Sequence, residues 1–194
     1  MNKQGATKVR AKKSKDYTVP AGKVLVLRTC AGDLTGYGGF QWPSSGLIAA
    51  PDWKKTASCG NGLHGLLWGS GNVGYLNLDQ SAKWLVVEVD ANSIVEIDRK
   101  VKFPSGVVIF VGNRDEAVAL VIKHAPPGTA CVFGTATAGY GGTATAGECG
   151  AISILRWDGK AGCYRRKSSD VGENGILPKT KYRLNDKGEF EKAE

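Results

Sequence analysis

The sequence is poor in the side chains that usually build metal sites. Its 194 residues include two histidines, His64 and His124, and a single methionine. The five cysteines form no CxxC pair, which argues against a zinc ribbon or a thioredoxin-like site. We therefore expect no metal and no cofactor, and reduced cysteines, as is usual in cytosolic proteins.

Motifs for nucleotide binding and for hydrolysis are missing too. There is no GK[ST] of a P-loop, no GxGxxG between a strand and a helix, and no GxSxG nucleophile elbow. No apolar run reaches the roughly 18 residues of a membrane span. The basic N-terminus lacks the apolar stretch of a secretory signal. The sequence thus predicts a soluble cytosolic protein and identifies no catalytic residue.

The net charge of +8 is concentrated at the N-terminus. Residues 1–15 contain six lysines or arginines and no acid, so we expect residues 1–16 to form a disordered basic tail. This tail is either a solubilising leader or an electrostatic arm for nucleic acid or another anion. The candidate anion-binding residues are Lys12, Lys13 and Lys15, together with a second basic run, Arg165, Arg166 and Lys167.

High glycine content, 27 residues, together with many Val, Thr and Tyr residues, favours β structure with tight turns. Apolar runs predict strands. Residues 116–124 are predicted to form a helix, which Asn113 or Asp115 caps at its N-terminus and which stops before Pro126. We predict an α+β domain over residues 17–125, with a mixed or antiparallel sheet and one main helix. The expected strands are residues 24–29, 83–89, 94–97, 100–103 and 107–111.

A repeat of eight residues follows: GTATAGYG, GTATAGEC and GAISILRW start at Gly134, Gly142 and Gly150. A fixed short period is typical of stacked β coils. Threonine and alanine alternate within each octad, which places methyl groups on one face and hydroxyl groups on the other. We predict a short β-solenoid with closing hairpins over residues 128–190.

Two polar residues stand out as candidates for a binding site. Arg28 lies inside an apolar strand and needs a partner, which is either a structural carboxylate or an anionic ligand. His64 lies among glycines and either hydrogen-bonds a turn or acts on a ligand. A cation and an aromatic face together suit a phosphorylated or nucleotide-like molecule. The predicted ligand-binding residues are Arg28, Thr29, Trp42, His64 and Trp68.

Three segments occur in an order that resembles a family of uncharacterised bacteriophage and prophage proteins. They are CGNGLHG at 59–65, the octads at 134–150, and GILPKTKYRLNDKGEF at 175–190. The resemblance implies a phage accessory protein in the cytoplasm of an infected bacterium. The expected partner is a host protein or a nucleotide-like small molecule, with antagonism of bacterial defence as a fitting role. Homo-oligomers and nucleic-acid contact through the tail are further expectations, and a membrane partner is not expected.

The sequence has two further, fainter similarities. The order of Arg28, His64 and the strand at 83–89 resembles ADP-ribosyltransferase-like folds, which implies an enzyme acting on NAD; a catalytic glutamate is not recognisable beyond a guess at Glu116. The Ala-Thr-Gly octads are similar to those of ice nucleation proteins, but two octads are too few for long ranks of threonine. A nucleic-acid-binding or virion structural protein is the remaining alternative.

Overall fold

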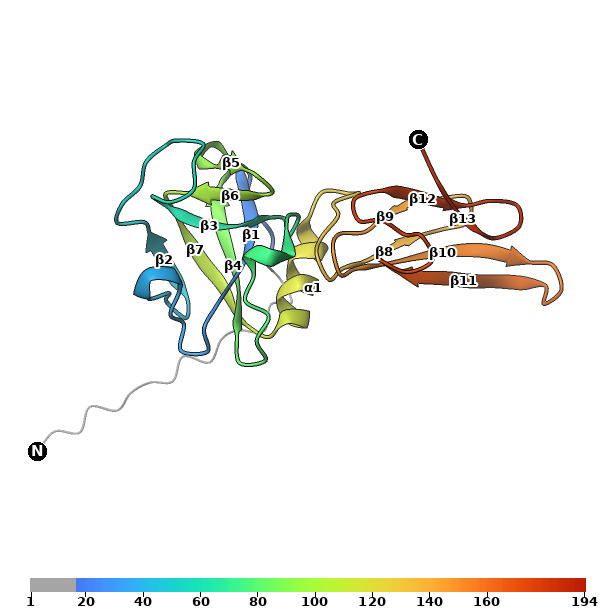
Figure 1. Cartoon of the computed structure of the whole chain (residues 1–194), viewed down its shortest axis with the longest axis horizontal. Helices are drawn as coiled ribbons and strands as arrows, with labels where there is room; N and C mark the ends of the chain where they lie inside the picture. The colour runs from blue at the N-terminus through green and yellow to red at the C-terminus, as the bar shows by residue number, and fades with distance from the viewer. Residues whose placement is uncertain (1–16) are drawn as a thin grey trace, which may run out of the picture.

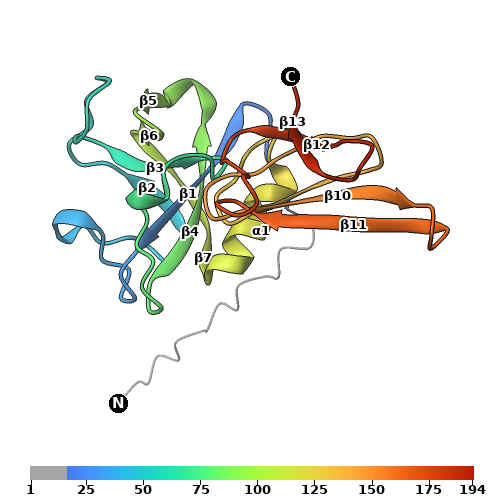
Figure 2. The same ribbon diagram turned by 45° about the vertical axis from the view of Figure 1, so that its right-hand side comes forward.

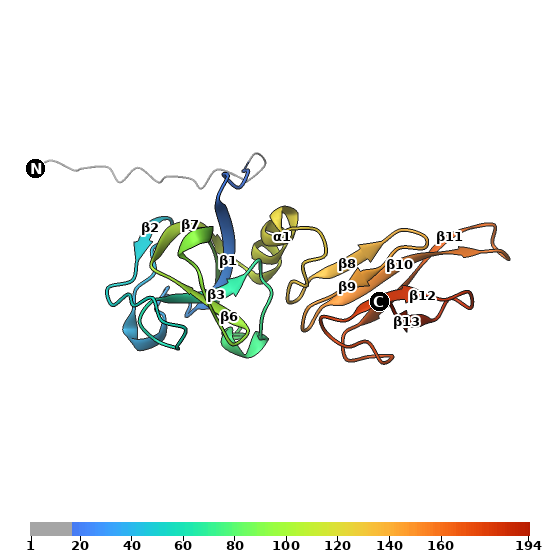
Figure 3. The same cartoon turned by 90° about the horizontal axis from the view of Figure 1, so that it is seen from above.

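The computed structural model describes residues 17–194, so the predicted tail, including Lys12, Lys13 and Lys15, lies outside the described residues. The described chain forms a large sheet, one α-helix and two small sheets (Figure 1). Seen from above, α1 lies between the large sheet and the small ones (Figure 3). The fold is therefore mainly β with one main helix, as predicted.

The large sheet has seven strands in the order β2-β7-β4-β1-β3-β6-β5, and every pairing in it is antiparallel. Three short 3-10 turns lie in the connections between its strands. The predicted strands are all present, with small shifts at their ends. The strands are β1 (Lys23–Cys30), β2 (Gly46–Ala49), β3 (Leu63–Leu67), β4 (Lys83–Asp90), β5 (Val95–Ile97), β6 (Lys100–Phe103) and β7 (Ser105–Gly112).

The central strands β1 and β4 are apolar along nearly their whole length because both faces of the sheet are covered. Leu25 and Leu27 face α1 and join one buried cluster, whereas Val26 joins a second cluster on the opposite face. The long segment 31–62 supplies part of that second cluster through Trp42, which is 1% exposed. Arg28 follows Val26 by two residues and therefore shares this second face.

The helix α1 (Arg114–His124) packs against the first cluster through Ala117, Val118, Leu120 and Val121. Its N-cap is Asn113, whose side chain accepts a hydrogen bond from the backbone N–H of Glu116. This confirms one of the two predicted caps and starts the helix two residues earlier than expected. No helix in the described part of the chain is long and apolar enough to cross a membrane.

After α1 the chain builds two three-stranded sheets that enclose a third buried cluster. One sheet has the order β11-β10-β8 and the other β13-β12-β9. The cluster between them contains Ala144, Ala146, Ile152, Ile154, Ile176 and Tyr182. The strands are β8 (Thr135–Ala138), β9 (Ala144–Thr145), β10 (Ala151–Asp158), β11 (Cys163–Asp170), β12 (Lys181–Leu184) and β13 (Phe190–Lys192).

The predicted β-solenoid is wrong: residues 128–190 form these two small sheets and contain no stack of coils. The physical reason is that only β8 and β10 pair in parallel, while the later strands return antiparallel and end the progression. The β10–β11 hairpin extends away from the large sheet (Figure 2). The closing hairpins themselves are present, as the turn sequences predicted.

The octad period still sets the register of this unit. Ala151 pairs with Thr135 and Ile154 with Ala138, a separation of sixteen residues, or two octads. The intervening β9 lies in the opposite sheet. Residues 134–149 therefore travel once around the buried cluster before β10 begins. Gly150, the first residue after this coil, lies close against Gly134, which begins it. A Cβ at Gly150 would come 2.5 Å from the carbonyl oxygen of Gly134.

Candidate functional site

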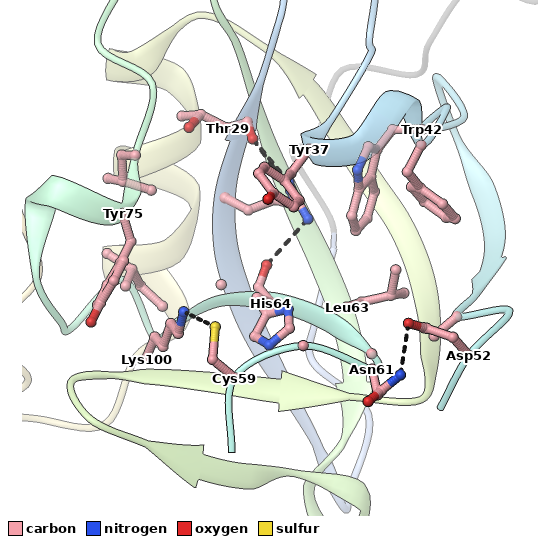
Figure 4. A pocket seen from close by; sticks show the side chains of 18 of the residues that line it. Thr29, Tyr37, Trp42, Asp52, Cys59, Asn61, Leu63, His64, Tyr75 and Lys100 are labelled. Carbon is pink, nitrogen blue, oxygen red and sulfur yellow. Dashed lines mark hydrogen bonds between the residues drawn. The ribbon is translucent and has the colours of Figure 1, made fainter. Parts of the chain in front are cut away.

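A cavity of about 670 Å³ opens on the face of the large sheet opposite α1. Its walls come from β1, β3, the first residue of β6, the segment 31–62 and residues 75–76 (Figure 4). Apolar and aromatic side chains form much of this wall: Tyr37, Phe40, Trp42, Leu63, Tyr75 and Leu76. Such a wall with a few polar groups is typical of a small-molecule site.

Arg28 of β1 is one of the two cations in this wall, and Lys100 is the other. The Arg28 carbon Cζ lies 3.9 Å from the centre of the Trp42 ring, a stacked cation–π contact. Its Nη1 donates to the carbonyl oxygen of His64 at 3.3 Å, and Nε and Nη2 both donate to the carbonyl oxygen of Thr29. Burial lowers the pKa of Arg28 to about 10. No carboxylate of residues 17–194 forms an ion pair with Arg28, so the predicted structural carboxylate is not its partner.

His64 lies on β3 and lines the same cavity, so the structure brings it together with Arg28 and Trp42 as predicted. Burial lowers the pKa of His64, and the positive charges of Lys100, Arg28 and Lys102 lower it further. Its Nε2 is buried and has no hydrogen-bond partner. The ring is therefore held neutral at pH 7 inside a positively charged region.

Sequence reasoning missed two lysines of β6. Lys102 is fully buried, and its ammonium group donates to Thr56 Oγ1, the Ser58 carbonyl and the Gly60 carbonyl at 3.1–3.3 Å. The signal for it was present, because Lys102 stands between the apolar residues Val101 and Phe103 of a strand, and a buried cation there needs acceptors. The three acceptors come from a loop distant in sequence, which no local pattern identifies.

Lys100, the second lysine, lies at the mouth of the cavity beside a cysteine. Its Nζ donates to Cys59 Sγ at 3.1 Å and lies 4.3 Å from the centre of the Tyr75 ring (Figure 4). The hydrogen bond from Lys100 lowers the pKa of the exposed Cys59 thiol. Cys59 is therefore a more acidic thiol than an isolated cysteine.

The other predicted site residues are divided between two units of the chain, the large sheet with α1 and the pair of small sheets that follows it. Thr29 lines the cavity, and its hydroxyl oxygen accepts the backbone N–H of Asn77. Trp68 does not line the cavity and packs instead against the cluster beneath α1. Arg165, Arg166 and Lys167 lie on β11, far along the chain from the cavity, and Arg165 pairs with Asp158 at 3.1 Å. No group of three or more His, Cys, Asp or Glu side chains in residues 17–194 is arranged to hold a metal ion.

Comparison with known proteins identifies relatives of a different kind from those expected. Residues 24–119 match the family model described as a domain of unknown function, DUF7666. The chain is 40% identical over 111 residues to the ice nucleation protein InaU of Pantoea ananas, which covers 56% of this chain and 11% of that protein. It is 41% identical over 97 residues to an ice nucleation protein of Pseudomonas syringae, covering 49% of this chain and 8% of that protein.

A third relative, an ice nucleation protein of Xanthomonas campestris pv. translucens, is 37% identical over 106 residues, covering 54% of this chain and 7% of that protein. The chain thus spans about a tenth of the length of the curated relatives it matches. No solved structure matches the chain.

These relatives overturn the resemblance to phage and prophage proteins, and with it the predicted phage accessory function, the anti-defence role and the NAD-dependent and virion alternatives. Ice nucleation proteins had been set aside because the octad repeat is short, whereas the relatives found are ice nucleation proteins, similar over 97–111 residues. The expected partners and the cytoplasmic location stay predictions.

Proposed function

We propose that this chain is a coil-and-cap module of the ice-nucleation type, in which residues 134–149 form one sixteen-residue coil and residues 150–192 cap it. One observation carries the proposal: β8 and β10 pair in parallel at an offset of sixteen residues, with β9 between them in the opposite sheet. The chain is also 37–41% identical to ice nucleation proteins over 97–111 residues, a similarity that includes the N-terminal domain.

The edges of the two small sheets support a cap with a direction. On the C-terminal side, β11 pairs antiparallel with β10, and β12 pairs antiparallel with β9, so both strands are covered. β8 is the edge strand of its sheet on the side away from β11, and β9 is the edge strand of its sheet on the side away from β13. Because antiparallel strands end the parallel progression, this unit stops growth after β10 and leaves room for additional coils before it.

Threonine and alanine alternate within the octads, so each further coil would expose threonine hydroxyl groups on its outer face. Thr135 and Thr137 of β8 are exposed, while Ala136 and Ala138 pack against the buried cluster. Each added coil would extend this row of hydroxyl groups by one rank along the sheet. A single coil gives a row of one rank, which is too small to order many water molecules.

The test varies the number of coils. Copies of residues 134–149 are inserted after Cys149, and the freezing temperature of droplets that contain the purified protein is measured. We expect the freezing temperature to rise as coils are added, because each coil lengthens the threonine row. A matched insert with lysine in place of the outward threonines should fold equally well and give no rise.

The length of the insert provides a second control. An insert of sixteen residues adds one full coil, so β10 stays in the same sheet as β8. An insert of eight residues adds half a coil, so the residues of β10 would arrive in the sheet that contains β9. We therefore expect the first protein to retain the melting temperature of the parent and the second to lose stability. Equal stability of the two inserts, or a freezing temperature independent of coil number, contradicts the proposal.

A further inference from the structure

The cavity on the large sheet has a marked excess of positive charge. Arg28 and Lys100 line it, the buried Lys102 lies beside it, and Asp52 is its one lining acid. Asp52 accepts a hydrogen bond from the side chain of Asn61. None of the three cations forms an ion pair within residues 17–194. The cavity therefore carries charge that the protein itself leaves uncompensated.

Arg28 is the cation best placed to receive an anion. Its guanidinium group has five N–H donors, and the three observed hydrogen bonds to carbonyl oxygens leave two of them free. The Trp42 ring stacks on the group and fixes its plane. A planar group held in this way is preorganised to donate to both oxygens of a carboxylate.

We propose that this cavity binds a small organic carboxylate with an aromatic or apolar body, a role that goes beyond the coil-and-cap function. The carboxylate accepts hydrogen bonds from the two free N–H groups of Arg28. The body of the ligand packs against the half-buried Phe40 and between the exposed rings of Tyr37 and Tyr75 at the rim.

The apolar and aromatic wall favours an organic carboxylate over inorganic phosphate. Lys102 already donates to three oxygens, and the Nε2 of His64 is covered by protein atoms. Lys100 donates to Cys59 and lies at the mouth of the cavity. A carboxylate on an aromatic body uses both the guanidinium group of Arg28 and the aromatic wall, whereas inorganic phosphate uses only the cations.

The experiment compares benzoate, benzamide and inorganic phosphate on the full chain by NMR titration. Benzamide has almost the same shape as benzoate and lacks the charge. We expect benzoate to bind with a dissociation constant of roughly 1 mM, as suits so small a ligand, and at least about tenfold more tightly than benzamide. Equal binding of the two, or tighter binding of phosphate, overturns the proposal.

Two variants locate the binding. Arg28→Gln should reduce benzoate affinity to that of benzamide, and Arg28→Lys should recover only part of it because the planar pair of donors is lost. Lys23→Gln is the matched control, since Lys23 lies on the same strand and its exposed charge pairs with Asp90 outside the cavity. Loss of benzoate binding in Lys23→Gln overturns the proposed contact.

A readout on the unmodified protein does not depend on the folding of any variant. Cys59 lines the cavity, while Cys149 and Cys163 are exposed elsewhere. Benzoate should slow alkylation of Cys59 by iodoacetamide and leave the rates at Cys149 and Cys163 unchanged, as followed by mass spectrometry of peptides. No slowing at Cys59 under saturating benzoate contradicts occupation of this cavity.

Discussion

Arg28 shows what a single residue reveals from sequence alone and what it conceals. A guanidinium group within an apolar strand predicted that a partner was required, and in the structure Arg28 lines the cavity and stacks on the ring of Trp42. The partners themselves are the carbonyl oxygens of Thr29 and His64. Backbone acceptors carry no signature in the sequence, so this part of the site could not be predicted.

His64 leads to a prediction about pH. Its folded-state pKa lies below the ordinary 6.5 because of burial and of the charges on Lys100, Arg28 and Lys102. The unfolded chain therefore binds the proton more readily, so this contribution to the free energy of unfolding is complete above about pH 6.5 and is lost as pH falls towards the folded-state pKa. Urea unfolding at pH 7.5, 6.5 and 5.5 measures the loss.

The His64→Gln variant is the control for this titration. It removes the His64 proton and retains His124, whose pKa is also lowered by burial and by Lys123. We expect the stability of the variant to fall less between pH 7.5 and 5.5 than that of the parent. Parallel losses in the two proteins would show that His64 does not contribute.

At the level of elements, the octads were predicted correctly as β structure and incorrectly as a solenoid. The alternation of Thr135 and Ala136 gave the exposed and inward faces, and the two-octad offset survives in the β8–β10 pairing. The antiparallel return of β11 and β12 depends on contacts between segments far apart in the sequence. A local repeat contains no information on where the stacking ends.

Gly150 provides a prediction on this element. An alanine there would place its Cβ 2.5 Å from the carbonyl oxygen of Gly134, so the turn of the coil must shift. We expect Gly150→Ala to lower the free energy of unfolding by roughly 1–3 kcal/mol, the usual cost of overpacking. Gly139→Ala is the control, because the same atom meets nothing within 4 Å there. Chemical denaturation of both variants decides the matter, and equal effects would argue against close stacking at Gly150.

In the molecule as a whole, the two units are joined by specific contacts. The carboxylate of Glu148, just after β9, accepts the backbone N–H of Val73 at 2.8 Å. The backbone carbonyl of Glu148 accepts the N–H of Phe133, whose ring meets that of Trp84 edge to face. The Glu148–Val73 and Phe133–Trp84 contacts do not follow from the sequence pattern, since each connects residues of separate units.

Glu148→Ala tests this junction. The variant leaves the Val73 N–H without its charged acceptor, so we expect a loss of roughly 1–3 kcal/mol in the free energy of unfolding. We also expect hydrogen exchange at Val73 to accelerate, because that amide loses its partner. Glu173→Ala is the control, since the Glu173 side chain is exposed and makes no hydrogen bond or ion pair within the described residues. An unchanged exchange rate at Val73 in Glu148→Ala would contradict the junction.

The most direct test of the coil is the pairing of β8 with β10 in solution. Backbone nuclear Overhauser effects of the full chain should connect residues 135–138 to residues 151–154 at a constant offset of sixteen, in the pattern of parallel strands. Contacts at an offset of eight residues, an antiparallel pattern, or the absence of contacts between these segments would contradict the coil and the function proposed from it.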